Sequence, residues 1–302
     1  MDTGDCAFHT SINKPIGPVL GGKVKMKCYH CGATEYNIIA QKEQIRFECY
    51  GYDKQVLECR FCGLIQLQPQ WVVAELDMLY ETYSRKEDFK GQKRKVKISK
   101  YLKKYMNKRD YILEVGCGYG DNLNYLRDKG FRVTGIDKDP TNCTGFPMIN
   151  KGYEEYTLLI KQDVIYAIHL LEHLPDPRGF IVWMLRNLTD RGKFILEIPS
   201  IDDPLLRLYN SKAYQKFCWY PYHLFFYSKD TAEQLFQWYP HLKLKFILRQ
   251  EYGLLNHLRW LLLRRPGNVN FHIPVLDDIY KKIMVWNGLG DTLVIVGEKC
   301  SI

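Results

Sequence analysis

Four cysteines stand in two pairs whose spacing suits a metal ion. Cys28 and Cys31 form one Cys-x-x-Cys pair, Cys59 and Cys62 form the other, and 27 residues separate the two pairs. Two such pairs place four thiolates tetrahedrally around one Zn²⁺, and a site filled by four cysteines is closed to substrates. The spacing therefore predicts a structural zinc site within residues 26–70. A redox dithiol is the alternative interpretation.

A glycine-rich segment follows a short apolar run and precedes a helical pattern. Glycines at a strand-to-helix turn let a cofactor approach bare backbone. The segment predicts a cofactor-binding loop. Its candidate contacts are Glu114, Gly116, Cys117, Gly118, Gly120, Asp121 and Asn122.

The acidic residues of this loop indicate which cofactor it binds. Asp121 stands where a dinucleotide-binding loop needs glycine or alanine, and a carboxylate at a helix N-terminus repels a pyrophosphate. S-adenosylmethionine has no phosphate and carries a sulfonium cation and an amino group, so Glu114 and Asp121 suit it. Asp137, next to Lys138, follows the next predicted strand and can accept hydrogen bonds from both ribose hydroxyls. We therefore predict an S-adenosylmethionine site.

Histidines that could act as bases come after two later strands. His169, Glu172 and His173 follow the predicted strand 164–168, and His223 lies in an aromatic stretch. Open α/β sheets bind ligands at the carboxyl ends of their strands, and histidine can accept a proton near neutral pH. The three histidines are therefore candidate catalytic bases. Alternatively, Glu172 and His173 only fix the loop, and the aromatic stretch is core.

The spacing His169-x-x-Glu172-His173 also matches the HxxEH pattern of inverted zinc peptidases. That motif requires a helix, which Pro175 and Pro177 interrupt. We therefore do not favour a peptidase.

These motifs, taken together, resemble a known family. Glu-Val-Gly-Cys-Gly-Tyr-Gly-Asp followed by Gly-Ile-Asp resembles the cofactor motifs of class I S-adenosylmethionine-dependent methyltransferases. The paired cysteines, His-Leu-Leu-Glu-His-Leu-Pro-Asp-Pro and Tyr-His-Leu-Phe-Phe-Tyr resemble, in their order, the zinc-ribbon methyltransferases of bacterial polysaccharide and natural-product pathways, which are relatives of sugar C-methyltransferases. The resemblance covers about residues 26–300. Sugar C-methyltransferases usually carry a further C-terminal domain, which we do not expect here.

The resemblance implies a fold and several residue roles. It implies a Rossmann-like, doubly wound α/β domain with a mostly parallel seven-stranded sheet and an antiparallel last strand. His169 would act first among the acceptor-side histidines, and Leu170 would line the cofactor. Tyr80 and Tyr83 would cover the cofactor as an N-terminal lid, although a plain helix face also explains them.

The elements that must position these residues are short apolar runs alternating with helical patterns. This alternation is typical of βαβ units and a parallel sheet. We expect a flexible leader at 1–25, the zinc-ribbon module at 26–70, a basic helical connector at 71–110 and the catalytic domain at 111–302. A helical insertion is expected at about 250–290. The predicted strands are 111–115, 132–136, 164–168, 193–198, 243–249 and 292–297.

Composition and charge narrow the class of protein. The chain has 302 residues and a formal net charge of +9, and twelve Lys or Arg residues lie within 85–109. No apolar run approaches the roughly 18 residues of a membrane span, and no signal peptide is evident, so we expect a cytoplasmic protein. The basic segment suits an anionic sugar nucleotide or, alternatively, RNA; a solvated helix face explains it as well. We expect a methyltransferase for a small molecule such as a sugar. The alternatives are an RNA methyltransferase and a cofactor-binding protein without catalysis.

Overall fold

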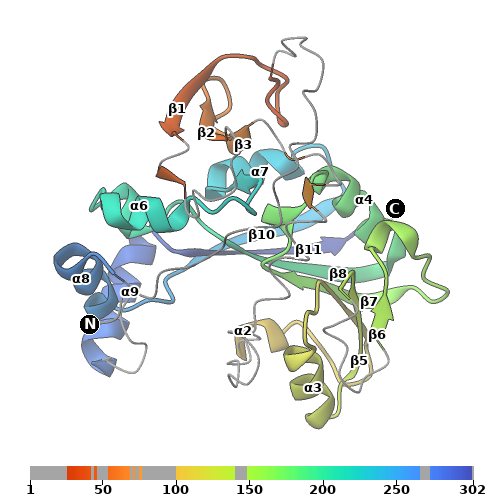
Figure 1. Cartoon of the computed structure of the whole chain (residues 1–302). Helices are drawn as coiled ribbons and strands as arrows, with labels where there is room; N and C mark the ends of the chain where they lie inside the picture. Colours follow the sequence, from red (N-terminus) through yellow and green to blue (C-terminus); the bar gives the residue numbers. More distant parts are fainter. Residues whose placement is uncertain are drawn as a thin grey trace, which may run out of the picture.

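A large mixed sheet forms the centre of the molecule, as the computed structural model shows (Figure 1). The structure describes residues 26–41, 44–45, 54–68, 71, 75–76, 100–139, 148–265 and 273–300. The predicted leader at 1–25, most of the predicted connector, and Tyr80 and Tyr83 lie outside these residues. Within the described residues, no helix has the length and apolar character to cross a membrane.

The main sheet has seven strands in the order β10-β11-β8-β7-β4-β5-β6. Strand β11 is antiparallel to both of its neighbours, and all other neighbouring pairs are parallel. The predicted Rossmann-like sheet with an antiparallel last strand is therefore confirmed. The strands are β4 (Tyr111–Val115), β5 (Arg132–Asp137), β6 (Met148–Asn150), β7 (Gln162–Ile168), β8 (Leu188–Pro199), β10 (Leu242–Arg249) and β11 (Thr292–Lys299).

Helices cover both faces of this sheet because successive strand residues point to opposite sides. Leu113 packs in a core with α4 (Pro177–Asn187) and α7 (Lys229–Phe236), whereas its neighbour Ile112 packs with α3 (Asp121–Asp128). Figure 1 shows α4 and α7 above the sheet and α3 below it, beside α2 (Lys100–Lys103). Both faces are buried, as the continuous apolar strands predict.

A second sheet joins the N-terminal cysteines to the catalytic half of the chain. Its strands are antiparallel in the order β1 (Tyr36–Ala40), β2 (Gln55–Cys59), β3 (Ile65–Gln68) and β9 (Phe225–Phe226). Strand β9 comes from the stretch just after His223. The zinc-ribbon residues also share one hydrophobic core with α4 and α7.

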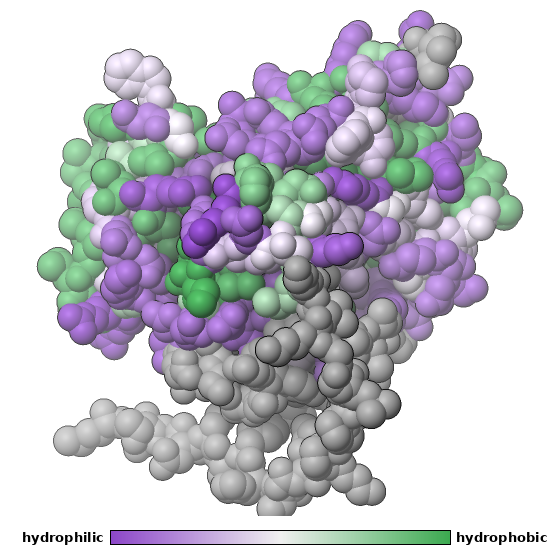
Figure 2. All heavy atoms as spheres, turned by 90° about the horizontal axis from the view of Figure 1, so that it is seen from above, coloured by the Kyte–Doolittle hydropathy of each residue, from purple (hydrophilic) through white to green (hydrophobic). Residues whose placement is uncertain are grey.

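Four further helices gather beyond the carboxyl end of β8. They are α5 (Pro204–Arg207), α6 (Lys212–Cys218), α8 (Leu254–Leu263) and α9 (Pro274–Trp286). The last two lie within residues 250–290, and Figure 2 shows hydrophobic residues along the side where Figure 1 places them. The exposed apolar side chains of α8 and α9 include Leu262, Val275 and Trp286.

Polar residues hold these two helices to each other and to the sheet. His257 Nδ1 lies 2.5 Å from the Tyr280 hydroxyl, and Asp277 accepts a hydrogen bond from the Leu254 amide. Buried Asp291 accepts from the amides of residues 251 and 252. His257 and Asp291 thus anchor the insertion.

Candidate active site

The glycine-rich loop turns the chain sharply from β4 into α3. Gly116, Gly118 and Gly120 have φ values of 74°, 52° and 73°, in the left-handed region that favours glycine. The Gly116 amide donates to the Ile136 carbonyl at 2.8 Å, which holds the loop at the end of β5. The backbone is therefore bare at the carboxyl edge of the sheet, where the predicted cofactor would lie.

Glu114 lies beneath this loop in a closed polar cluster. Its side chain is 2% exposed and accepts hydrogen bonds from Asn122 Nδ2 and the Tyr166 hydroxyl, both at 2.9 Å. Burial, together with the charges of Asp137 and Asp121, raises the pKa of Glu114 to about 7 despite these two bonds. The role of Tyr166 as a partner of Glu114 was not predicted, because a tyrosine in an apolar strand is expected to be a core residue.

Asp137 fastens the loop from the neighbouring strand. Its Oδ2 accepts from the Gly118 amide at 2.7 Å, and its Oδ1 accepts from the Asp139 amide at 2.9 Å. Burial raises the pKa of this carboxyl. Each carboxylate oxygen can accept a further bond, so Asp137 retains capacity for a ligand hydroxyl.

The remaining predicted cofactor contacts surround the same loop. Cys117 and Asn122 are buried, Asp121 is half-buried at the first position of α3, and Lys138 is exposed. Leu170 lies against the loop, because a methyl group added at Gly116 would come within 3.0 Å of its Cδ1 atom.

The histidines named from the sequence meet around one carboxylate. His169 follows β7 with φ 53°, and the 3₁₀ turn η6 (Leu171–His173) then places Glu172 inside, 2% exposed. Oε1 of Glu172 lies 3.5 Å from His169 Nδ1 and 3.8 Å from His173 Nε2. The ring of His223 packs edge-on against His173, with 4.8 Å between centroids. Through Leu170, this histidine cluster adjoins the glycine-rich loop.

Glu172 and His223 have opposite responses to their shared surroundings. Burial alone would raise the pKa of Glu172, but its interactions with the imidazoles of His169, His173 and His223 lower it to about 2. Burial lowers the pKa of His223 to about 3, and the charge of His173 adds to the effect. At neutral pH, Glu172 is a carboxylate and His223 is a neutral imidazole.

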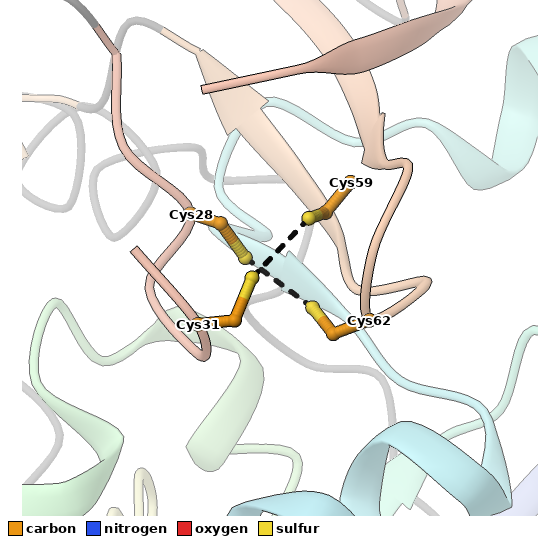
Figure 3. A group of neighbouring side chains, drawn as sticks. All are labelled: Cys28, Cys31, Cys59 and Cys62. Carbon is orange, nitrogen blue, oxygen red and sulfur yellow. Dashed lines mark hydrogen bonds between the residues drawn. The ribbon is translucent and has the colours of Figure 1, made fainter. Parts of the chain in front are cut away.

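The four predicted zinc ligands converge on one point (Figure 3). Cys28 Sγ lies 3.4 Å from Cys62 Sγ, and Cys31 Sγ lies 3.5 Å from Cys59 Sγ. Sulfurs bound to one zinc ion at about 2.3 Å lie about 3.8 Å apart, so the cluster is close to the size that zinc requires. The four thiols fit a closed tetrahedral Zn²⁺ site.

Each cysteine pair sits in a tight turn. The residues after the pairs, Gly32 and Gly63, have φ values of 74° and 73°, and their amides donate to the carbonyls of Cys28 and Cys59. The turn of the first pair also contacts α4, since the Tyr29 hydroxyl donates to Asp176, the N-cap of that helix, and accepts from the Arg178 amide.

Backbone bonds run from the zinc-ribbon residues to the histidine cluster. Leu67 of β3 donates its amide to the Leu224 carbonyl at 2.9 Å, and the Leu224 amide donates to the Glu172 carbonyl at 2.8 Å. Trp71 Nε1 donates to the Pro221 carbonyl at 2.8 Å. His223 is therefore held between β3 and Glu172.

Comparison with known proteins agrees with this geometry. Residues 90–239 match the family model described as a methyltransferase domain. The chain carries a methyltransferase domain. It is similar, at 27% identity over 130 residues, to a tRNA U34 carboxymethyltransferase of Aliarcobacter butzleri, and this match covers 38% of the chain and 43% of that relative.

Solved structures of methyltransferases are also similar to the chain. The plantazolicin methyltransferase BpumL in complex with SAH matches with 16% identity and a TM-score of 0.43, over 66% of this chain and 80% of that one. An S-adenosylmethionine-dependent methyltransferase from Archaeoglobus fulgidus matches with 19% identity and a TM-score of 0.42, over 62% and 85%.

Proposed function

We propose that the chain transfers a methyl group from S-adenosylmethionine to a small-molecule acceptor. The observation that carries this proposal is the acidic character of the glycine-rich loop at the carboxyl edge of the sheet. Glu114, Asp121 and Asp137 surround the loop, and their negative charge suits a sulfonium and an ammonium group while disfavouring a pyrophosphate. The methyltransferase-domain match over residues 90–239 supports the same conclusion.

The cofactor would lie over Gly116, Gly118 and Gly120. In this arrangement Asp137 accepts hydrogen bonds from the ribose hydroxyls, and Glu114 and Asp121 offset the positive charge of the methionine part. Leu170, which touches the loop, would pack against the cofactor on the side that faces the histidines. Methyl transfer is an in-line displacement, so this alignment contributes to the rate.

His169 is the base that we propose for the acceptor. Its side chain is 32% exposed, compared with 19% for His173, and its Nδ1 atom lies beside the Glu172 carboxylate. A carboxylate at that position orients the imidazole and stabilises its charged form after it accepts a proton. His173 and His223 complete the proposed acceptor side.

The proposed acceptor is a sugar or sugar nucleotide. The basic segment at 85–109 suits an anionic carrier, and the order of motifs resembles that of zinc-ribbon methyltransferases of glycan and natural-product pathways. The second candidate is RNA, because the relative from Aliarcobacter butzleri has a tRNA substrate in its name.

The test is to incubate the zinc-loaded protein with methyl-labelled S-adenosylmethionine and a cell extract, and then separate small metabolites, RNA and protein. Label in the sugar-nucleotide fraction, reduced by about 10²–10⁴-fold in His169→Ala, supports the proposal. His241→Ala is the matched control, because His241 is exposed and distant from the cluster in sequence.

Other outcomes would redirect the proposal. Label in RNA, with binding that weakens steeply as salt rises, would favour the RNA methyltransferase. Tight binding of S-adenosylmethionine without label in any fraction would favour a cofactor-binding protein. Failure to bind S-adenosylmethionine at all would contradict the proposed cofactor.

A further inference from the structure

We propose that Glu172, His173 and His223 form a second metal site, which binds a divalent first-row transition ion beside the glycine-rich loop. One carboxylate oxygen and one ring nitrogen from each histidine lie within 4.8 Å of one another. The site is separate from the four cysteines, and it offers nitrogen and oxygen rather than sulfur.

The buried carboxylate is the strongest observation. Glu172 is 2% exposed, and within the described part of the chain no hydrogen-bond donor reaches either of its carboxylate oxygens with hydrogen-bonding geometry. An ionised carboxylate withdrawn from water is costly unless a cation or several donors compensate it. The nearest partners are the imidazoles of His169 and His173, at 3.5 and 3.8 Å. A metal ion between these groups would supply the missing positive charge.

A hydrogen bond through Nδ1 leaves Nε2 of His173 on the side of Glu172. Its Nδ1 atom lies 2.9 Å from the Tyr222 carbonyl, and a carbonyl oxygen can only accept, so Nδ1 carries the proton. Nε2 lies 3.8 Å from Glu172 Oε1 and is the ring nitrogen that a metal ion would bind. Metal-bound histidines characteristically donate their other ring nitrogen to a backbone carbonyl or carboxylate in this way.

The separations favour a shared ion over a direct hydrogen bond. A charge-assisted N–H···O bond spans about 2.7–2.9 Å, which is far shorter than the 3.8 Å between His173 Nε2 and Glu172 Oε1. Two ligand atoms held at about 2.1 Å from one tetrahedral ion lie about 3.4 Å apart. Small side-chain adjustments would bring all three donors to such separations.

His223 is placed for this role by the zinc-ribbon residues. The stretch that carries it is bonded to Trp71 and β3 on one side and to the Glu172 carbonyl on the other. Its ring packs edge-on against that of His173, with 4.8 Å between centroids, and a ring nitrogen of each lies near Glu172. The cysteine site thus positions a ligand of the second site.

The donor set indicates the class of metal. Two imidazoles and one carboxylate suit Zn²⁺, Fe²⁺ or a similar ion rather than Mg²⁺ or Ca²⁺, which prefer oxygen ligands. Three protein ligands leave positions open for another molecule, as in catalytic sites. His169 lies next to these positions, because it contacts Glu172 and its side chain is more exposed than that of His173. An acceptor hydroxyl could bind there.

Cobalt separates this site from the cysteines. We would add Co²⁺ to protein whose cysteine site is already filled with zinc, and follow visible absorption and the equivalents bound. The expected result is one further Co²⁺ per chain with d–d bands but no thiolate-to-cobalt charge-transfer band. Glu172→Gln, which is nearly isosteric, and His223→Ala should each weaken this binding by at least about tenfold. His241→Ala should leave it unchanged.

Folding and the proposed function are checked independently. Retained zinc and an unchanged unfolding temperature show that a variant still folds. If His223→Ala does not fold, Glu172→Gln alone tests the site. No additional Co²⁺, or Co²⁺ bound equally by Glu172→Gln, would overturn the second site. Because S-adenosylmethionine binding is measured separately, loss of the metal proposal would leave the proposed cofactor standing, and the reverse also holds.

Discussion

The glycine-rich loop and the histidine cluster are neighbours in space but are built in different ways. The loop is assembled within one βαβ unit: Glu114, the glycines, Asn122 and Asp137 all lie on or between β4 and β5. The cluster needs segments that lie far apart in the chain. Glu172 and His173 follow β7, His223 precedes β9, and β9 pairs with β3 of the zinc-ribbon residues.

The two sites should therefore be sensitive to different substitutions. Backbone conformation and local packing determine the loop, so a change there should affect cofactor binding first. If the four cysteines bind zinc, the metal fixes the turns next to β2 and β3, so loss of the metal should displace His223 while leaving the loop formed. The predictions below test that separation.

The largest effect is expected from Cys59→Ser, which removes one of four sulfurs. Zinc binding in small modules is worth on the order of 10 kcal/mol, and β2 and β3 have little other support outside the shared core. The variant should lose zinc, measured by metal content, and should lower the unfolding temperature. Methyl transfer should fall more than S-adenosylmethionine affinity.

Cys300→Ser is the matched control for this variant. Cys300 lies after β11, and its amide bonds the His241 carbonyl, away from the cysteine cluster. It should keep one zinc per chain. Full zinc content in Cys59→Ser would show that the four sulfurs are not the site.

The second effect is expected from Gly135→Ala, beneath the loop. A methyl group there would lie 2.5 Å from both Cys117 Sγ and Leu123 Cδ1. Overpacking of this kind costs about 1–3 kcal/mol, and relief requires the side chains of Cys117, within the loop, and Leu123 to shift. The variant should weaken S-adenosylmethionine binding in calorimetry while keeping its zinc.

Gly288→Ala separates loop displacement from general loss of stability. It also destabilises, because Gly288 has φ 73°, but none of the described residues has an atom within 4 Å of the added methyl group. It should therefore bind S-adenosylmethionine normally. Equal affinity losses in the two variants would mean that Gly135 has no special link to the loop.

The same difference explains what could be predicted from the sequence. The ends of β4 and the residues of the loop were predictable, because apolar runs and glycines are local signals. The sequence identified each candidate histidine, but it did not predict that their side chains lie together. That depends on β9, whose two residues are too short to show a periodic pattern.

Two other features escaped prediction for similar physical reasons. Strand β6 was not located, because its three residues are partly exposed and form no buried apolar run. The hydrogen bond from Tyr166 to Glu114 joins two strands, and a single apolar strand gives no sign that its tyrosine has a polar partner. Contacts between distant segments were the missing information.

The third effect concerns pH and the Glu114 carboxyl. Its pKa of about 7 in the folded protein exceeds that of an unfolded glutamate, about 4.3, so folding favours the protonated form between these values. Stability of the cofactor-free protein should therefore fall as pH rises through this window. A bound cation favours the ionised form, so S-adenosylmethionine affinity should rise with pH.

Below pH 7 that affinity should change by up to about tenfold per pH unit. Glu114→Gln should remove most of the pH dependence, although Asp121 and Asp137 still face the loop. Calorimetry between pH 6 and 8 measures both proteins. An identical pH profile for the two would exclude Glu114 as the titrating group.

The smallest effect is expected from Trp71→Phe, which tests the link between the two regions most gently. The substitution keeps an aromatic ring but removes the bond from Nε1 to the Pro221 carbonyl, two residues before His223. One such bond contributes about 0.5–1.5 kcal/mol. We expect the free energy of unfolding to fall by that amount in chemical denaturation, with zinc content and S-adenosylmethionine affinity unchanged.

If Co²⁺ binding at Glu172, His173 and His223 also weakens, the zinc-ribbon residues act on that site through residues 219–227. If it stays at the wild-type value, the pairing of β3 with β9 is sufficient to hold His223 in place.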